Sequence, residues 1–555
     1  MNAPNTTPSR SRHANLNGAG APYMRAGLAL LPVVGLITLG GCMVGPNYER
    51  PPAATNDAWL EQSGSAAAVA PTPINERWWE TFNDPILTSL IHAALQNNLS
   101  LRTAGLRVIE ARAARGIAVG RFFPQVQEAF GDIRTQQLSK NDATSAGDTS
   151  FATDSLGLQA MWELDFWGKF RRGIEAADAA VLLTVADFDA VLVSLTADVA
   201  SNYIIIRSLE ERLVYARANV SLQTRTLELT ESRFRAGAVS ELDVSTARAT
   251  LANTQALIPL FEKSLFQTKL ALCILLGRTP SELESELSPI DSAAPQVPEA
   301  PAQIAVGIPA ELLRRRPDVR AAERLAAANS ARIGEAVADL LPSISIAGAT
   351  GFASSTFDGV RSPDLGDIFS SDSFTGFIGL QVNWPILNYG RIQSNVRVRD
   401  ARYEQAVAAY QESVLRAAGD VESGLSEFLR SRERTGYLAD AVSASKRSVE
   451  LSLIQYRAGA VDFIRVNNAQ TDLVTQQDSF VASRADIALG AVRTYRALGG
   501  GWEIRGDQEF VDPETAERMR KRTNWGDVLS AGWQNGKDFG FARPSAADES
   551  PQGDK

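Results

Sequence analysis

The sequence predicts a mainly α-helical protein with a small β part, in which one structural design occurs twice. Three observations lead to this prediction. Similar segments recur at a constant spacing, four short segments alternate apolar and polar side chains, and two long stretches contain no proline. The composition is that of a globular chain with enough apolar material for a core, because 45% of its 555 residues are hydrophobic and 21% are charged.

The constant spacing indicates an internal two-fold repeat. Residues 234–239, FRAGAV, resemble residues 456–461, YRAGAV, at an offset of 222 residues, which is 456 minus 234. The same offset places Trp162 on Trp384. Because several such matches occur in the same order, we infer a duplication. Each copy should contain a helix, two strands, a very long helix and a final helix.

The N-terminal region has the features of a secretion signal. Residues 26–41 are uncharged and mostly apolar, and Arg25 precedes them. A membrane-spanning helix needs about 20 apolar residues, whereas the core of a signal peptide needs only about 7–15 behind a basic residue. The short segment therefore predicts a signal peptide over residues 1–41. Translation that starts at Met24 instead of Met1 would give a signal of more usual length.

Cys42, the residue after this signal, is predicted to carry a covalent lipid. The sequence LGGC at residues 39–42 resembles the lipobox of bacterial lipoproteins, in which the cysteine becomes the lipidated first residue of the mature chain. Met43 stands where many inner-membrane lipoproteins have aspartate, so the resemblance favours the outer membrane. No cofactor other than this lipid is expected.

Four segments are predicted to be strands with one apolar and one polar face. Residues 155–166 alternate most clearly, and residues 375–385 repeat the pattern in the second copy. Their partners, at about 125–134 and 343–352, alternate less cleanly. Strands of about 9–11 residues with this pattern suit an outer-membrane barrel. A soluble hairpin packed on a core fits the alternation equally well, and the signal and lipobox favour the membrane.

Four strands are too few to close a membrane barrel within one chain. Single-chain outer-membrane barrels have at least about eight strands, and open sheet edges are not tolerated in lipid. The chain must therefore oligomerise if the strands span a membrane. Two chains would give a barrel filled by side chains, whereas three would give a lumen.

The two proline-free stretches, residues 168–236 and 391–458, are predicted to be very long helices. At about 1.5 Å per residue each would span roughly 100 Å. The shorter helical segments of the first copy, residues 98–121 and 240–276, would together span about 90 Å. The similar lengths predict a helical wall of uniform height.

One of these long stretches carries two apolar stripes at heptad spacing. The first stripe includes Val181, Phe188 and Leu195, and the second includes Ala186 and Val193. Two stripes on one helix predict neighbours on both sides. A closed ring of helices would provide them, and so would a three-helix bundle.

Composition excludes several functions. The net charge of −9 argues against a nucleic-acid partner, and the basic runs at 314–316 and 520–522 are expected to be solvated helix surface. Two cysteines and two histidines leave little material for nucleophilic or metal chemistry, and Cys273 is expected to be a buried apolar residue. The sequence therefore predicts that the protein is not an enzyme.

Several motifs give the chain a strong resemblance to the outer-membrane factor family, the TolC-like channels of tripartite efflux pumps, and to its NodT-type lipoprotein branch. These motifs are VGPNYERP at 44–51, RWWETFNDP at 77–85, WELDFWGK at 162–169 and IPAELLRRRPD at 308–318. The resemblance implies a homotrimer with a twelve-stranded β-barrel, four strands from each chain, continuous with a long periplasmic α-helical barrel. It also implies a lipid-anchored outer-membrane location.

The resemblance further implies partners and a passive role. Family members receive substrates from an inner-membrane transporter, here expected to be of the RND type, through a periplasmic adaptor (membrane fusion) protein, and release them outside. Two alternatives remain open at this point: an exit duct for type I protein secretion, and an envelope-spanning lipoprotein scaffold that conducts nothing. The lipobox and the motif at 308–318 favour efflux, and a scaffold has no need of alternating strands.

The resemblance also suggests residues that close the periplasmic end. Asn468 lies where many members have an aspartate that forms a ring at the constriction, so that ring of carboxylates is absent here. The closed state is expected instead to depend on Arg465 paired with an acidic residue near the helix turns; exposed helix ends without a role are the alternative. The candidate gate residues are Tyr456, Asp462, Arg465, Asn468, Glu241 and Asp243, with Gly237 and Gly459 at the helix-turn tips.

These features divide the chain into successive parts. The predicted division is a signal peptide at 1–41, a lipidated linker at 42–80, a first repeat at 81–277, an equatorial segment at 278–310, a second repeat at 311–501, and an equatorial segment with a mobile tail at 502–555.

Overall fold

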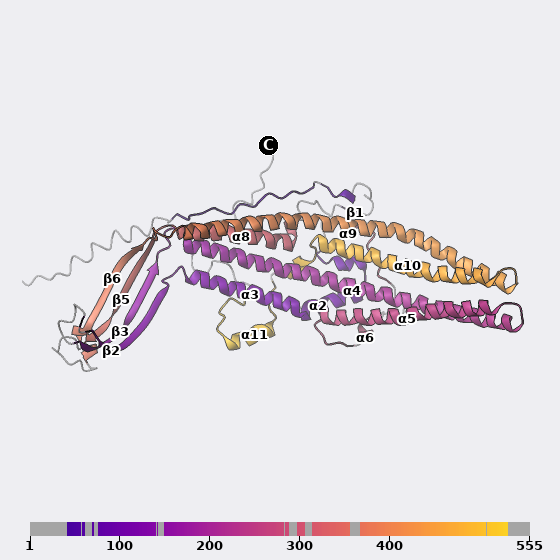
Figure 1. The fold of residues 1–555 in the computed structure, drawn as a ribbon, viewed down its shortest axis with the longest axis horizontal. Coiled ribbons are helices and arrows are strands. Elements are labelled where there is room, and N and C mark those ends of the chain that lie inside the picture. The colour runs from indigo at the N-terminus through magenta and orange to yellow at the C-terminus, as the bar shows by residue number, and fades with distance from the viewer. Residues whose placement is uncertain are drawn as a thin grey trace, which may run out of the picture.

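The computed structural model describes residues 42–530, except for 57, 62–68, 71–75, 140, 142–148, 282, 288–296, 306–313, 356–366 and 507. The predicted signal peptide and the predicted tail after residue 530 lie outside the described residues. The described chain is strongly elongated, with a β-sheet at one end and long helices that reach the other end (Figure 1). The expectation of a mainly helical chain with a small β part is confirmed.

The same order of elements occurs in both halves of the chain. The first half contains α3 (Leu99–Gly120), β2 (Val126–Gln137), β3 (Ser150–Glu163), α4 (Lys169–Arg235) and α5 (Glu241–Leu275). The second half contains α8 (Pro317–Ala338), β5 (Ser343–Ser355), β6 (Phe374–Asn383), α9 (Arg391–Arg457) and α10 (Phe463–Ala497). Corresponding helices have the same length: 22 residues in α3 and α8, 67 in α4 and α9, and 35 in α5 and α10.

Glycines set the boundaries of the long helices. Gly168 and Gly390 precede α4 and α9 with φ of 76° and 78°, a conformation that favours glycine. Strand β3 ends earlier than its alternation predicts, because Asp165 starts the turn into α4. Its carboxylate oxygens accept hydrogen bonds from the backbone N–H groups of Phe170 and Arg171 at 2.9 and 3.1 Å.

The helices form a curved layer. At each level along the layer, the two long helices lie with two short ones. Helix α4 contacts α3 and α5 on one side and α8 and α10 on the other, while α9 contacts α8 and α10. One edge of the layer is therefore α3 with α5, and the other edge is α9 (Figure 1). Helix α4 holds one stretch long and apolar enough to cross a bilayer, and half of that stretch is buried in the protein.

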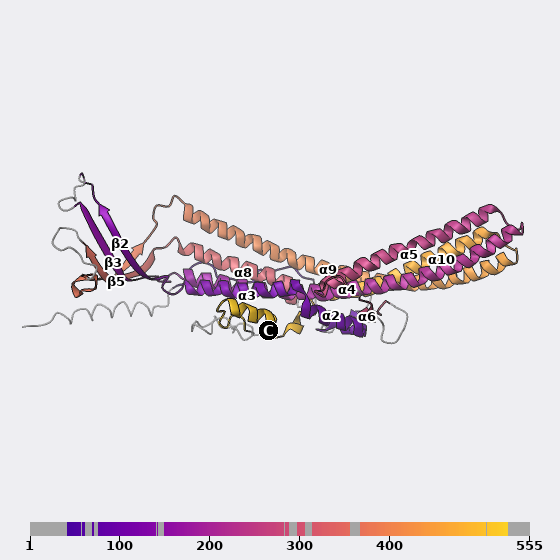
Figure 2. The same ribbon diagram turned by 90° about the horizontal axis from the view of Figure 1, so that it is seen from below.

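Smaller elements cover one side of this layer near its middle (Figure 2). They are η2 (Trp78–Phe82), α2 (Pro85–Asn97), α6 (Glu284–Leu287), η5 (Trp502–Arg505) and α11 (Pro513–Arg522), together with the two-residue strands β1 (Val69–Ala70) and β4 (Ile304–Ala305). The largest core cluster lies at this level. In it Trp78 is fully buried and stacks on Tyr495 with ring centroids 5.2 Å apart.

The four long strands form one antiparallel sheet in the order β2-β3-β5-β6. The pairing of β3 with β5 joins the two halves of the chain. Strands β2 and β6 are the sheet edges, so each has one side without a partner strand among the described residues. The short 3-10 helices η3 (Asp367–Phe369) and η4 (Ser371–Ser373) contact β5, and the sheet extends beyond the helical layer (Figure 1).

Candidate functional site

The sheet has one apolar face and one polar face. Its register places Trp162, Ile346 and Leu380 in one cross-strand row, so these side chains share a face. On the opposite face Gln159 lies across from Glu128, and their side chains are hydrogen-bonded at 2.5 Å. Strands β3, β5 and β6 largely continue this separation, whereas β2 does not, because Phe130 shares the polar face with Glu128 and Gln127 lies across from Ala160 on the apolar face.

The apolar face is uncovered. Leu158, Ile378 and Leu380 are 61%, 83% and 66% exposed. A hairpin packed on a soluble core would bury such side chains, so this alternative from the sequence is not supported. A contiguous apolar surface of this kind fits a hydrocarbon environment, with the polar face turned towards water.

Cys42 lies at the junction between the sheet and the helices. Its side chain is exposed, and two residues later the N–H of Val44 donates to the carbonyl oxygen of Trp167 at 3.1 Å. Trp167 stands between β3 and α4 and donates its indole N–H to the carbonyl of Pro342 at 2.8 Å, just before β5. The predicted lipidation site is thus beside the ends of the strands.

Gly237 and Gly459 lie at the turns farthest from the sheet. Their φ angles are 73° and 74°. The N–H of Gly237 donates to the carbonyl of Phe234 at 2.8 Å and that of Ala238 to the carbonyl of Arg233 at 2.9 Å, which satisfies the last carbonyls of α4 in a Schellman motif. Gly459 and the residue after it repeat this pattern at the end of α9.

Tyr456 is buried at the tip rather than on an open surface. It is 1% exposed, its ring contacts Phe463 edge-on at 5.7 Å, and the Arg233 guanidinium lies 4.5 Å above its centroid. Arg233 also donates to the carbonyl of Tyr456. These contacts join the α4–α5 hairpin to the α9–α10 hairpin.

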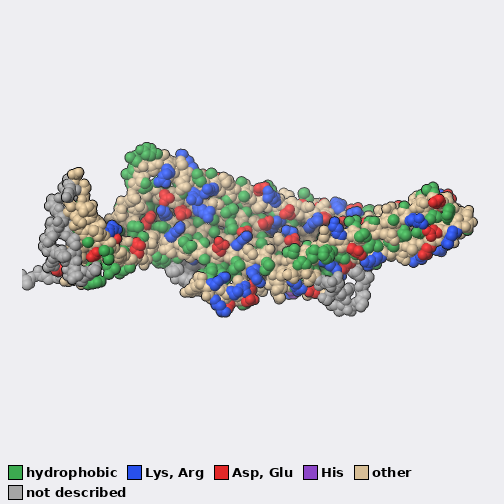
Figure 3. Space-filling model, turned by 60° about the horizontal axis from the view of Figure 1, so that its bottom comes forward, with side chains coloured by type: hydrophobic (Ala, Val, Ile, Leu, Met, Phe, Trp, Pro, Cys, Tyr) green, Lys and Arg blue, Asp and Glu red, His purple; other side chains and the backbone are tan. Residues whose placement is uncertain are grey.

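The other gate candidates occupy different positions at the tip. Asp243 completes a capping box with Ser240, whose N–H donates to the Asp243 carboxylate at 3.1 Å. Glu241, Asp462, Arg465 and Asn468 are exposed, and their side chains have no partner in the described part of this chain. Arg465 therefore pairs with none of the acidic residues that the structure describes in this chain. Acidic and basic side chains mix at this tip (Figure 3).

A buried polar seam between α4 and α10 is the feature that sequence analysis missed here. Gln470, 3% exposed, donates to the Thr226 hydroxyl at 2.8 Å, and Asn219 donates to Gln477 at 2.7 Å. Farther from the tip, Arg212 makes two bonds to Asp478, at 2.6 and 2.9 Å. The signal was present in the sequence: polar residues at 219, 223, 226 and 230 continue the heptad spacing of the apolar stripe.

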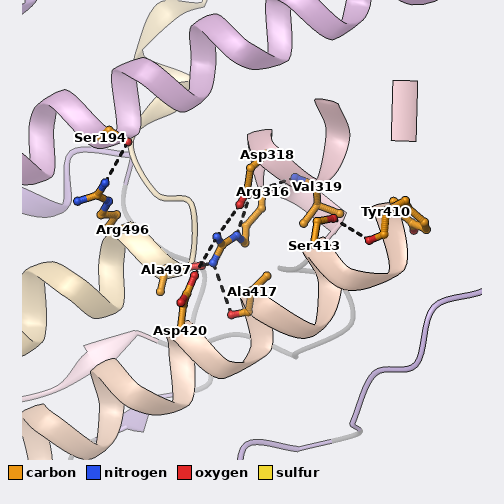
Figure 4. A network of polar contacts seen from close by, with 10 residues as sticks. All are labelled: Ser194, Arg316, Asp318, Val319, Tyr410, Ser413, Ala417, Asp420, Arg496 and Ala497. Atoms are coloured by element: carbon orange, nitrogen blue, oxygen red, sulfur yellow. Dashed lines mark hydrogen bonds and ion pairs between the residues drawn. The ribbon is translucent and has the colours of Figure 1, made fainter. Parts of the chain in front are cut away.

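Arg316 corrects one sequence interpretation. The run at 314–316 was expected to be solvated surface, but Arg316 is only 8% exposed. It lies where α8 begins, α10 ends and α9 passes beside them (Figure 4). Its guanidinium donates to the carbonyl of Ala497 at 2.5 Å and to the carboxylates of Asp318 and Asp420 at 2.7 and 3.4 Å.

We call the place where α8 begins, α10 ends and α9 passes, around Arg316, the joint. Its opposite charges stabilise each other's ionised forms. Burial by itself would lower the pKa of the Arg316 guanidinium, but the hydrogen bonds and charges of Asp318 and Asp420 together outweigh burial and raise it. Burial by itself would raise the pKa of the Asp318 carboxyl, but Arg316 and the backbone N–H of Val319 together outweigh burial and lower it. Nearby, Arg496 of α10 donates to Asp198 and Ser194 of α4 at 3.1 and 3.4 Å, which ties the same joint to α4 (Figure 4).

No group of three or more potential metal ligands occurs within the part of the chain that the structure describes. Cys273 is fully buried there, as expected. Three features of the elongated chain stand out: the apolar face of the sheet, the contacts of Arg316 with α9 and α10, and the helix-turn tip.

Comparisons with known proteins define the class. The family model described as "Outer membrane efflux protein" matches residues 90–278 and 308–500. The pyoverdine export outer membrane protein OpmQ of Pseudomonas putida is 33% identical over 452 residues, covering 80% of this chain and 92% of that protein. The toluene efflux pump outer membrane protein TtgI of Pseudomonas putida is 31% identical over 481 residues, covering 85% and 98%.

A solved structure shows the same fold. The structure of the outer-membrane channel OprN has a TM-score of 0.75 and 32% identity, and the match covers 83% of this chain and all of that one. An apolar uncovered sheet on a long helical layer is thus the fold of an outer-membrane channel. This chain belongs to the outer membrane efflux protein family and is an outer-membrane efflux channel.

Proposed function

We propose that three copies of this chain form one closed channel, the exit duct of a tripartite efflux system. The unpaired edges of the sheet support this proposal most directly. In the part of the chain that the structure describes, strands β2 and β6 each lack a partner on one side, and such edges must be paired in lipid. Pairing β2 of one copy with β6 of the next would close twelve strands around a lumen lined by the polar face.

The edges of the helical layer support the same assembly. Large apolar side chains are exposed on α3 with α5 and on α9, the two edges of the layer. They include Leu99, Ile117, Leu260, Phe266 and Ile274 on the first edge, and Val398, Leu415, Tyr437 and Ile454 on the second. Joining unlike edges of successive copies would close a ring and bury these side chains.

The channel would act passively and without a cofactor. The family relatives include an efflux-pump component, and an outer-membrane channel needs an energy source elsewhere. We infer an inner-membrane transporter of the RND type and a periplasmic adaptor as its partners. The elements beside the layer, including α6 and α11, would form the equatorial girdle, and the chain would have no enzymatic activity of its own.

Assembly and conduction can be tested together. Protein purified from outer membranes should have the mass of three chains by native mass spectrometry in detergent. The same preparation should give a pore in planar lipid bilayers. A monomer or dimer that conducts would refute the three-chain arrangement, and a trimer without conductance would refute the duct.

Cys42 is proposed to carry the lipid that anchors each copy. The support is the lipobox-like sequence and the exposure of this cysteine beside the strand ends. Labelling of cells with radioactive palmitate should mark the protein, and Cys42→Ser should abolish the label. Label retained by this variant would exclude Cys42 as the lipidation site.

Arg465 is proposed to help close the tip by pairing with an acid of a neighbouring copy. Its exposure and the exposed acids Asp462 and Glu241 support such contacts between copies. Each exposed pair contributes only about 0–1 kcal/mol, so three-fold repetition is needed. Arg465→Ala should raise the resting conductance in bilayers. Unchanged conductance would remove Arg465 from the gate.

A further inference from the structure

The segment that follows Cys42 is bound to the helical layer along its length. We name residues 43–56 the N-terminal strap. It runs beside α9 away from the sheet (Figure 1). Along this path Arg50 pairs with Glu323 of α8 at 3.0 Å, and Gln411 of α9 donates to the carbonyl of Pro52 at 3.1 Å. Most of the hydrogen bonds between the strap and the helices involve the residues nearest Cys42.

Arg172 of α4 holds the beginning of the strap. Its guanidinium donates to the carbonyls of Val44 and Gly45 at 3.1 and 3.3 Å and to the Asn47 side chain at 2.9 Å. Glu175 accepts its remaining bond at 2.7 Å. Arg172 is only 1% exposed, and a buried guanidinium is unfavourable unless its donors are satisfied. The strap supplies most of these acceptors.

Three glycines let the strap approach this closely. Gly45 has φ of +87°, and a Cβ on it would overlap the backbone of Gly334 in α8. A Cβ on Gly334 would lie 2.7 Å from the carbonyl oxygen of Val44, and one on Gly168 would lie 2.5 Å from the Met43 side chain. The backbone of the strap thus lies directly against the backbones of two helices.

The other half of the chain provides an internal comparison. The positions 222 residues after Arg172 and Gly168 are Ser394 and Gly390, and the position 218 residues before Gly334 is Gly116. Nothing lies within 4 Å of a Cβ built on Gly116 or Gly390. The glycines occur in both halves, but the arginine and the bound segment occur together in one. Gly116 and Gly390 lie on the two free edges of the layer, so the arginine, which only the first half has, is what distinguishes the strap site.

We propose that Arg172, Gly168 and Gly334 form an anchor clamp that fixes Cys42, and hence its lipid, at the junction between the sheet and the helices. The anchoring role rests on the proposed lipidation of Cys42. An extended chain covers at most about 3.3–3.6 Å per residue, so an unclamped strap would let the lipid move by several nanometres from the strands. With the clamp in place, the lipid on Cys42 stays at a fixed position relative to the strands.

Hydrogen exchange of the full-length protein, purified in detergent and followed by mass spectrometry, tests the clamp. The Val44 amide, whose N–H donates to the carbonyl of Trp167 at 3.1 Å, should be protected in the parent protein. Arg172→Ala and Gly334→Ala should each speed its exchange at least tenfold. Alanine favours a helix more than glycine does, so Gly334→Ala should release the strap without weakening α8, whose own amides should stay protected.

Arg332→Ala is the matched control, since Arg332 lies two residues from Gly334 and its hydrogen bond goes to Asn329. Its Val44 amide should remain protected. Fast exchange of the Val44 amide in the parent, or unchanged protection of it in both Arg172→Ala and Gly334→Ala, would overturn the clamp. The mass of the N-terminal peptide reports the lipid separately: an unmodified Cys42 would overturn the anchoring role together with the proposed lipidation, even if the variants release the strap.

Discussion

At the residue scale, Asn98 and Arg316 make corresponding hydrogen bonds in the two halves of the chain. Asn98 lies between α2 and α3 and donates to the carbonyl of Leu275 at the end of α5 at 2.9 Å. Arg316 precedes α8 and donates to the carbonyl of Ala497 at the end of α10. Each side chain joins the end of one short helix to the start of the other, which lets two short helices continue beside one long helix.

Replacement of Arg316 should therefore destabilise the joint. In Arg316→Met the carbonyl of Ala497 loses its donor and Asp318 loses its partner, which should lower the free energy of unfolding by about 1–3 kcal/mol. Thermal unfolding followed by circular dichroism in detergent would measure this. Arg315→Met is the control, because Arg315 is half exposed and pairs with Glu503 at 2.7 Å. Equal losses in both variants would contradict the role of Arg316.

The lowered pKa of Asp318 predicts a pH dependence. A carboxyl with a lower pKa in the folded state stabilises the fold above its unfolded pKa of about 3.9. That contribution disappears as the pH falls through the folded pKa. The protein should thus be more stable than Asp318→Asn at pH 7, and the two should converge below about pH 4. A difference that persists in strong acid would show that the Asp318 charge is not its origin.

At the element scale, the two faces of each strand have opposite requirements. Leu158 and Gln159 are neighbours on the central strand β3 but point to opposite faces. One face requires apolar side chains against lipid and the other tolerates polar ones. The strand ends and the glycine turns then fix where the sheet stops and where each long helix reverses.

Leu158→Arg should block assembly in the outer membrane. An arginine facing lipid costs about 2–4 kcal/mol near the bilayer centre, while Gln159→Arg should cost little because that side chain shares a face with Glu128. The amount of trimer recovered from outer membranes measures both variants. Equal recovery would show that the apolar face does not contact lipid.

Replacement by alanine should have opposite effects on stability at a turn glycine and at a glycine within a helix. Gly459→Ala forces a Cβ into a left-handed conformation and should cost about 1–2 kcal/mol, measured as faster hydrogen exchange at the tip. Gly436 lies inside α9, and nothing lies within 4 Å of its added Cβ. Gly436→Ala should stabilise the helix by about 0.8–1 kcal/mol. Effects of the same sign would contradict this account of the turn.

At the scale of the whole molecule, one chain forms only part of the proposed closed channel. Among the described residues, both the sheet and the helical layer have two free edges. The polar seam between α4 and α10 lies inside one chain, whereas exposed apolar side chains of α3, α5 and α9 lie on its edges. Contacts between copies would thus be more apolar than the contact between the two hairpins near the tip.

Phe266→Glu on the α5 edge should weaken assembly. Burial of a phenylalanine contributes about 1.5–3 kcal/mol, and the proposed trimer contains three such interfaces. Phe266 is 63% exposed in one chain. Sedimentation in detergent should show more monomer for Phe266→Glu, while Phe266→Tyr, which keeps the ring, should assemble normally. Unchanged assembly of Phe266→Glu would place the interface elsewhere.

Features set by local patterns were accessible from the sequence. The absence of proline predicted long helices at 168–236 and 391–458, and the structure has them at 169–235 and 391–457. Alternation located the strands within a few residues, since side chains on a strand change face at every position. The family and the outer-membrane efflux function also followed from sequence motifs.

The tertiary structure alone decided which polar side chains are buried. Arg316 was interpreted as part of a basic run and Tyr456 as part of a gate, and no motif singled out Arg172. Each is nevertheless buried against segments more than a hundred residues away. Local periodicity depends on neighbours along the chain and is therefore legible in the sequence. A buried charge depends on which distant carbonyls and carboxylates surround it, and only the packing of the helices brings those together.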